Sequence, residues 1–176
     1  KTMMLAQQLY EGLELGSKGP VGLITYMRTD STRLSELAQE EARSYIEEKF
    51  GKEYMPKKPN VYVAGKKAQD AHEAIRPSDI ERTPESLKDS LSRDQLRLYQ
   101  LIWKRFVASR MSPAKYENTR VSIEGVSKTG EHHLFTAPFS RLLFDGFMKV
   151  YDPGDEDEAA ASYSAGFVQG GEILLQ

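Results

Sequence analysis

The 176-residue sequence contains no cysteine, which excludes disulfides and thiolate metal sites and is compatible with a reducing compartment. It has only three histidines, so we expect no histidine-rich metal site. Its longest apolar runs are far shorter than the roughly 18–20 residues that span a bilayer, and no signal-peptide pattern opens the chain. With 39% hydrophobic and 28% charged residues, the composition is that of an ordinary globular protein.

Charge is unevenly distributed along the chain. Residues 1–116 carry 20 Lys and Arg against 16 Asp and Glu, whereas residues 117–176 carry 4 against 10, which together match the totals of 24 and 26. A polyanion would therefore meet the first part rather than the second. The excess of four positive charges over residues 1–116 (20 minus 16) supports nucleic-acid binding only weakly, because many lysine-rich helices are simply solvated.

Apolar residues at three- and four-residue spacing predict three helices before residue 116. The first starts near Met4 and ends at Gly12. The second covers residues 34–50, and its candidate N-caps are Ser31, Thr32 and Ser35. The third opens at residues 92–95 with the spacing of a capping box. Its predicted apolar stripe comprises Leu96, Tyr99, Trp103, Phe106 and Val107.

Weaker signals fill the segments between these helices. Residues 70–75 predict a helical turn that stops before Pro77, because the residue before a proline avoids the helical region. Thr83-Pro84 has the pattern of an N-cap followed by proline at the first helical position. Residues 13–20 and 52–68, which contain glycine and proline, are predicted loops.

After Tyr116 the spacing of apolar residues changes from helical to alternating, in residues 119–124 and parts of 133–151. The segment 167–175 ends in apolar residues. Turns are expected at Gly125, Gly130, Gly146 and Pro153-Gly154. We therefore predict an α+β chain, with a mainly helical domain over residues 1–116 and part of a β domain over residues 117–176. The acidic run at residues 155–158 could hold a divalent metal, but four carboxylates on a loop are more often solvated surface.

The stretch from Gly22 to Ser31 changes abruptly from apolar to polar. A buried strand over residues 21–27 would place Tyr26 and Arg28 on the same face, since residues two apart on a strand project together. A phenol beside a guanidinium could present a nucleophile to a phosphate. A buried tyrosine beside a structural arginine is the plainer alternative.

Two motifs resemble the active-site region of type IA DNA topoisomerases, and most closely the bacterial ones. They are Ile24-Thr25-Tyr26-Met27-Arg28-Thr29-Asp30-Ser31 and, further along, Ala71-His72-Glu73-Ala74-Ile75-Arg76-Pro77. Three further matches keep the family's order: Lys1-Thr2-Met3-Met4 leading to Leu9-Tyr10-Glu11, Leu98-Tyr99-Gln100-Leu101-Ile102-Trp103, and Phe144-Asp145-Gly146-Phe147. The resemblance covers essentially the whole chain, and five motifs in order make chance a poor explanation.

The resemblance implies an enzyme that cuts one DNA strand, passes the other through the gap and reseals it without ATP, relaxing negative supercoils. Tyr26 would attack a backbone phosphate and stay joined to the 5′ end. A free phenol attacks poorly at neutral pH unless its proton is removed or the phenolate is stabilised. Arg28 would stabilise the charge that builds on the phosphate, and His72 would carry a proton or contact the phosphate.

The expected catalytic residues are therefore Tyr26, Arg28 and His72, and the expected DNA-binding residues are Arg28, Asp30, Arg33, His72 and Arg76. Several roles stay open. His72 could instead cap a helix or bond a carbonyl, and Asp30 could orient Arg28 or the phenol, or cap the helix over 34–50. Arg33 and Arg76 could bind flanking phosphates or pair with surface carboxylates.

The family's Mg²⁺-binding acidic cluster belongs to a separate Toprim domain that nothing in this sequence matches. We therefore expect no metal site and no cofactor in this chain, with Mg²⁺ bound outside it. By the same resemblance, a helical segment precedes Lys1 and the rest of the β domain follows Gln176. The expected partners are DNA, as a single-stranded segment of a negatively supercoiled duplex, and the remaining domains of the parent enzyme, with no membrane.

The tyrosine-bearing domain is expected to be helix-turn-helix-like, and the β part to belong to an arch. The resemblance also implies a bacterial cytoplasmic, nucleoid-associated location, and the chain alone is not expected to relax DNA. Two alternatives remain. One is a non-catalytic DNA-binding module in which residues 1–50 act as a helix-turn-helix. The other is the equivalent piece of topoisomerase III or reverse gyrase.

Overall fold

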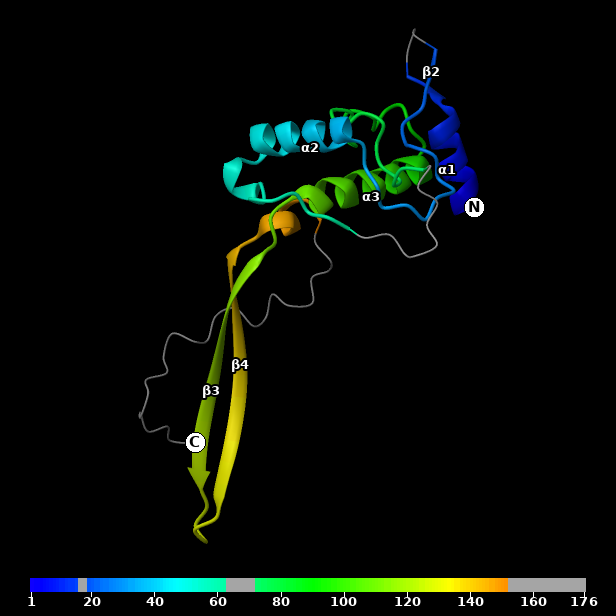
Figure 1. The fold of residues 1–176 in the computed structure, drawn as a ribbon. Coiled ribbons are helices and arrows are strands. Elements are labelled where there is room, and N and C mark those ends of the chain that lie inside the picture. Colours follow the sequence, from blue (N-terminus) through cyan, green and yellow to red (C-terminus); the bar gives the residue numbers. More distant parts are fainter. Residues whose placement is uncertain (16–18, 63–71, 152–176) are drawn as a thin grey trace. The chain divides into compact units, whose positions relative to one another are not determined.

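The computed structural model describes residues 1–15, 19–62 and 72–151 (Figure 1). The chain divides into two compact units: residues 1–113 with 147–151, and a second unit whose described part is residues 114–146. In the described part, the first unit contains three α-helices and a two-stranded sheet, and the second contains a two-stranded antiparallel sheet. The predicted α+β class is confirmed at this level.

Helix α1 (Thr2–Glu11) ends as predicted at Gly12. Gly12 has a positive φ of 114°, which favours glycine, and its N–H donates to the Gln8 carbonyl. The loop expected over residues 13–20 contains instead two short antiparallel strands, β1 (Leu13–Glu14) and β2 (Pro20–Val21). Strands of two residues are too short to show alternation in a sequence.

Helix α2 (Glu36–Lys49) begins after Ser35, whose Oγ accepts the Ala38 N–H at 3.3 Å. Ser35 is thus the N-cap among the three candidates. The helix ends at Phe50, whose N–H donates to the Ile46 carbonyl. A short 3-10 helix, η1 (Lys52–Tyr54), follows within the region expected as loop.

Helix α3 (Arg93–Arg110) confirms the predicted capping box. The Ser92 Oγ accepts the Gln95 N–H at 3.4 Å, and the Gln95 Oε1 accepts the Ser92 N–H at 2.9 Å. Four residues of the predicted stripe are buried, and Leu96 packs against the core while partly buried. The buried four are Tyr99, Trp103, Phe106 and Val107.

The core of the first unit forms where α1 and α2 pack on α3 (Figure 1). The ring of Tyr45 on α2 meets the ring of Trp103 edge-on, with centroids 5.8 Å apart. The polar tips of two α3 aromatics are satisfied by the preceding turns: Trp103 Nε1 donates to the Ile80 carbonyl and Tyr99 Oη to the Arg82 carbonyl. Burial raises the pKa of the Tyr99 phenol well above its ordinary value.

The described part of the second unit is a long hairpin of β3 (Lys115–Val126) and β4 (His132–Phe144). Its turn includes Gly130, as predicted. Gly125 lies within β3, opposite His133, so the turn predicted there is wrong. The 3-10 helix η2 (Gly146–Lys149) follows β4 and opens at Gly146, another predicted break.

Three other local predictions are wrong. The strand expected over residues 21–27 is reduced to Val21 in β2 and one isolated bridge between Ile24 and Pro77. Residues 72–75 form bends rather than a helical turn, and residues 84–90 form turns rather than a helix. Thr83 still acts as a local cap, because its Oγ1 accepts the Ser86 N–H.

The rest of the predicted turn at 70–75, the acidic run at 155–158, the turn at Pro153-Gly154 and the apolar segment at 167–175 lie outside the described residues. Within the described ranges, every helix is too short or too polar to cross a membrane.

Candidate active site

The segment that carries Tyr26 runs between the end of α1 and residues 76–78. The Leu23 N–H donates to the Leu9 carbonyl of α1 at 2.7 Å, and the Ser78 N–H donates to the Leu23 carbonyl at 3.0 Å. The side chains of Leu23 and Ile24 are buried in the core. The apolar run that resembled a strand is therefore a buried connection with partners on both sides.

Gly22 lets this connection approach α1 closely. A Cβ added at Gly22 would lie 2.8 Å from the Tyr10 carbonyl oxygen, which is backbone and cannot move aside without shifting the helix end. A side chain at Gly22 would therefore displace the start of the Tyr26 segment or the end of α1.

Thr25 fixes the backbone immediately before Tyr26. Its N–H donates to the Arg76 carbonyl at 2.9 Å, and its Oγ1 donates to the Ala74 carbonyl at 2.7 Å. The same Oγ1 accepts the Arg76 N–H at 3.0 Å. Sequence reasoning missed this role, and the only local signal was one hydroxyl within an apolar run.

The ring of Tyr26 lies between two other aromatic rings. The Tyr10 ring meets it edge-on with centroids 5.4 Å apart, and the His72 ring is tilted against it with centroids 5.5 Å apart. The Tyr26 residue is 38% exposed, so it is neither buried in the core nor far from it. The structure therefore brings together two of the three predicted catalytic residues, with Tyr10 as an additional neighbour.

The loop that carries His72 is tied to the start of α2. The Ala74 N–H donates to the Arg33 carbonyl at 2.8 Å, and the Ser35 N–H donates to Glu73 Oε1 at 3.0 Å. With the Thr25 bonds, the loop is attached to both the Tyr26 segment and the turn that precedes α2.

Glu73 and Arg76 form an ion pair within this loop. Glu73 Oε2 accepts from Arg76 Nε at 3.1 Å and lies 3.0 Å from Nη2, and the side chains are 24% and 15% exposed. Burial raises the pKa of the Glu73 carboxyl, but the Arg76 charge and the hydrogen bonds from Arg76 and Ser35 outweigh it, so the pKa lies below its ordinary value. Of the two readings of Arg76, pairing with a carboxylate is the one present.

Arg28, Asp30 and Arg33 lie on the exposed turn between Tyr26 and α2. None of their side chains forms an ion pair with another described residue. Asp30 does not cap α2, because Ser35 occupies that position. Two basic side chains and one acidic side chain are thus presented to solvent within seven residues of Tyr26 along the chain, without a contact to its ring among the described residues. Ser31 is the turn former here, since its Oγ accepts the Arg33 N–H.

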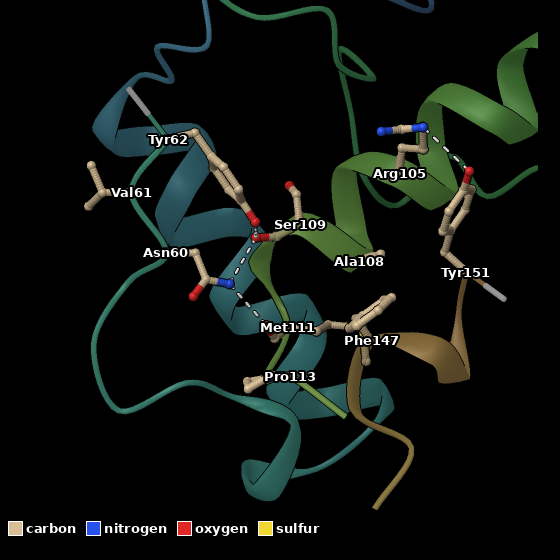
Figure 2. Close-up of a pocket in the computed structure, with 10 residues that line it drawn as sticks. All are labelled: Asn60, Val61, Tyr62, Arg105, Ala108, Ser109, Met111, Pro113, Phe147 and Tyr151. Atoms are coloured by element: carbon tan, nitrogen blue, oxygen red, sulfur yellow. Dashed lines mark hydrogen bonds between the residues drawn. The ribbon is translucent and has the colours of Figure 1, made fainter. Parts of the chain in front are cut away.

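An open pocket of about 550 Å³ lies elsewhere in the first unit, at the C-terminal end of α3 (Figure 2). Asn60 Nδ2 donates to the Ser109 and Met111 carbonyls, and Tyr62 Oη donates to the Ser109 carbonyl. These bonds satisfy carbonyls that a helix end leaves unpaired. We interpret this pocket as the seam where residues 60–62 pack on α3, since Tyr26 and His72 do not line it.

A metal centre is not evident in the part of the chain that the structure describes, where no group of three His, Asp or Glu side chains is placed to hold an ion. The candidate site offers a phenol and an imidazole in contact, and two exposed guanidinium groups follow the phenol in the chain. Such groups suit nucleophilic attack on an anionic ester, with positive charge to receive the oxygens.

Comparison with known protein families matches residues 1–175 to the DNA topoisomerase family. The chain belongs to the type IA DNA topoisomerases. Among solved structures, full-length topoisomerase I from Thermotoga maritima is similar, with 42% sequence identity and a TM-score of 0.73. The match covers 100% of this chain and 25% of the Thermotoga chain. This type IA chain therefore spans a quarter of the length of that relative.

Proposed function

We propose that Tyr26 is the nucleophile of an ATP-independent topoisomerase that cuts and reseals one DNA strand to relax negative supercoils. The Tyr26 oxygen would form a bond to a backbone phosphorus while the bond to the 3′ oxygen breaks. The phenolic proton would pass to a base, and a proton would reach the departing 3′ oxygen. The phosphodiester's energy is kept in the 5′-phosphotyrosine, so resealing needs no ATP.

The observation that carries this proposal is the contact between the Tyr26 and His72 rings in a member of this family. Arg28, two residues after Tyr26, would stabilise the phosphate charge through a guanidinium that is exposed to solvent. His72 would carry a proton or contact the phosphate. Arg33 and Asp30 are proposed to meet the flanking DNA from the same exposed turn, whereas Arg76, also predicted to bind DNA, is paired with Glu73.

We assign residues 1–116 to the tyrosine-bearing, helix-turn-helix-like domain and residues 117–176 to part of a β arch. Mg²⁺, where the reaction uses it, would be bound outside this chain. DNA with a single-stranded segment is the proposed substrate, the remaining domains of the parent enzyme are the proposed partners, and the bacterial cytoplasm with its nucleoid is the proposed location.

The nucleophile is tested in the full-length protein with end-labelled single-stranded oligonucleotides. If Tyr26 keeps the 5′ end, a 3′-labelled oligonucleotide should leave its label on the denatured protein, and a 5′-labelled one should not. Tyr26→Phe should abolish this adduct completely, because phenylalanine has no oxygen to attack with, while DNA binding survives.

Tyr10→Phe is the discriminating variant, since it removes the neighbouring phenol but keeps the ring that contacts Tyr26. An adduct that persists in Tyr26→Phe and disappears in Tyr10→Phe would move the nucleophile to Tyr10. Sequence-specific binding to duplex DNA without any adduct would instead favour a non-catalytic DNA-binding module.

A further inference from the structure

We infer that Glu73 and Arg76 act as one positioning pair that holds the His72 loop against Tyr26, so that Arg76 is not a phosphate ligand. This inference rests on the proposed function, because it concerns the placement of groups that would act in DNA cleavage. In this positioning role, neither Glu73 nor Arg76 contacts DNA.

Arg76 already uses all three of its guanidinium nitrogens within the protein. Nε and Nη2 face Glu73 Oε2, and Nη1 donates to the Pro77 carbonyl at 3.0 Å. Its side chain is 15% exposed. These contacts use three of the five N–H donors, and a phosphate could take the forked Nε/Nη2 edge only by displacing Glu73 from a charge-assisted contact.

Glu73 uses both carboxylate oxygens, and they lead to different segments. Oε2 accepts a hydrogen bond from the Arg76 guanidinium, and Oε1 accepts one from the Ser35 N–H at the start of α2. The carboxylate therefore joins the His72 loop to the turn that carries Arg33. An unpaired charge left in so enclosed a place would be costly, which ties each partner to the other.

The pair is connected to both rings of the candidate site. His72 directly precedes Glu73, and the Arg76 backbone exchanges hydrogen bonds with Thr25, which directly precedes Tyr26. Loss of the pair would release the loop between these two attachments. The distance between the His72 and Tyr26 rings would then vary, while the exposed Arg28 and Arg33 keep their access to DNA.

The test compares Glu73→Gln, Arg76→Gln and the double variant in the full-length protein. For each, the rate of adduct formation is measured at saturating single-stranded oligonucleotide, and the dissociation constant is measured across a series of salt concentrations. We expect each single variant to cleave about tenfold more slowly, and the double variant to be no slower than the slower single one, because members of one unit are not additive.

Binding should distinguish positioning from a direct bond to phosphate. We expect the affinity of the Arg76→Gln protein to stay within about twofold of the parent and its salt slope to be unchanged. The salt slope is the change in the logarithm of affinity with the logarithm of salt concentration. On single-stranded DNA, removal of one phosphate-binding cation lowers its magnitude by about 0.7. Arg33→Gln, at a proposed phosphate-binding position, should show this decrease and serves as the comparison. A slope lowered by about 0.7 in Arg76→Gln, multiplicative effects on cleavage, or unchanged cleavage would each overturn the inference.

Two further variants guard against a simple loss of folding. Glu73→Arg combined with Arg76→Glu restores opposite charges at the two positions, and it should cleave faster than either of its single components. Arg76→Lys keeps the charge but not the fork, so it should slow cleavage without altering the salt slope. The adduct test on Tyr26→Phe stands apart from all of these, so failure of the nucleophile assignment is recognised independently of the salt slopes.

Discussion

The Tyr26 ring is oriented by its aromatic neighbours rather than by its hydroxyl. No hydrogen bond reaches the Tyr26 oxygen from any residue that the structure describes, whereas Tyr10 and His72 both contact the ring. Aromatic pairs of this geometry contribute about 0.5–1.5 kcal/mol each beyond their buried area. The phenol oxygen is therefore free to approach a substrate while the ring is held from two sides.

Arg28 provides the first prediction at the scale of single residues. In the full-length protein, Arg28→Lys should slow adduct formation by about tenfold, less than the roughly 10²–10³-fold typical of removing a whole charge-stabilising donor. Lysine keeps the positive charge but cannot present the planar fork that matches a phosphate. The measurement is the single-turnover cleavage rate of a labelled oligonucleotide.

Arg93→Lys is the matched control, because Arg93 is also exposed but lies in the first turn of α3. It should cleave at the parent rate. If Arg28→Lys also cleaves at that rate, Arg28 has a structural role and the charge at the phosphate comes from elsewhere.

Single side chains were predicted unevenly from the sequence. The caps Ser35 and Ser92 were identifiable because their partners lie three residues away. The bonds of Thr25 to Ala74 and Arg76 join residues about fifty positions apart, and no local pattern encodes them. For Arg76 the sequence left two alternatives, and the structure shows that its guanidinium is paired with Glu73, three residues away.

At the scale of elements, α1, α2 and α3 were predictable because helix signals are local: an apolar stripe, a cap and a glycine or polar stop. The prediction of a strand over residues 21–27 was wrong because its signal was not specific to one kind of structure. A short apolar run is compatible with a strand or with any buried connection. Here the partners of Leu23 are the end of α1 and Ser78 rather than a neighbouring strand.

The capping box of α3 supports a stability prediction. Ser92→Ala removes the oxygen that accepts the Gln95 N–H, and N-cap losses of this kind cost about 1 kcal/mol. With a urea m-value of about 2 kcal/mol/M, the unfolding midpoint should fall by about 0.5 M. Fluorescence of Trp103, the single tryptophan and a buried residue of α3, follows the transition.

Ser90→Ala is the control for this experiment. Ser90 is exposed, lies outside any helix, and its hydroxyl makes no hydrogen bond to another residue within the described ranges. Its midpoint should stay close to that of the parent. Equal midpoints for Ser92→Ala and the parent would mean that packing of α3, rather than its cap, decides where the helix begins.

At the scale of the whole molecule, the meeting of Tyr26 and His72 could not be predicted from local patterns. It depends on the buried connection at 23–25 reaching residues 74–78. The resemblance to type IA enzymes predicted that both residues belong to one site, and the structure adds that their ring centroids are 5.5 Å apart. Charge balance and composition alone would have left only a weak case for DNA.

The 176-residue chain by itself is expected not to relax supercoiled plasmid. Among the described residues no group of three His, Asp or Glu side chains is placed to hold an ion, and the proposed function has Mg²⁺ bound outside this chain. Agarose gel electrophoresis of plasmid incubated with the chain and Mg²⁺ should show unchanged supercoiling. Relaxation that disappears in Tyr26→Phe would mean that this chain completes the reaction with its own residues.

Among the described residues, the connection that carries Tyr26 forms one isolated bridge, at Ile24. Before Tyr26, it is held by the buried side chains of Leu23 and Ile24 and by hydrogen bonds to Leu9, Ala74, Arg76 and Ser78. Tyr26 itself is 38% exposed, and exposed segments can open locally at a cost far below that of global unfolding. The proposed nucleophile can therefore shift by small steps while the residues before it and the three helices stay in place, which would suit the proposed bond between this residue and a DNA end.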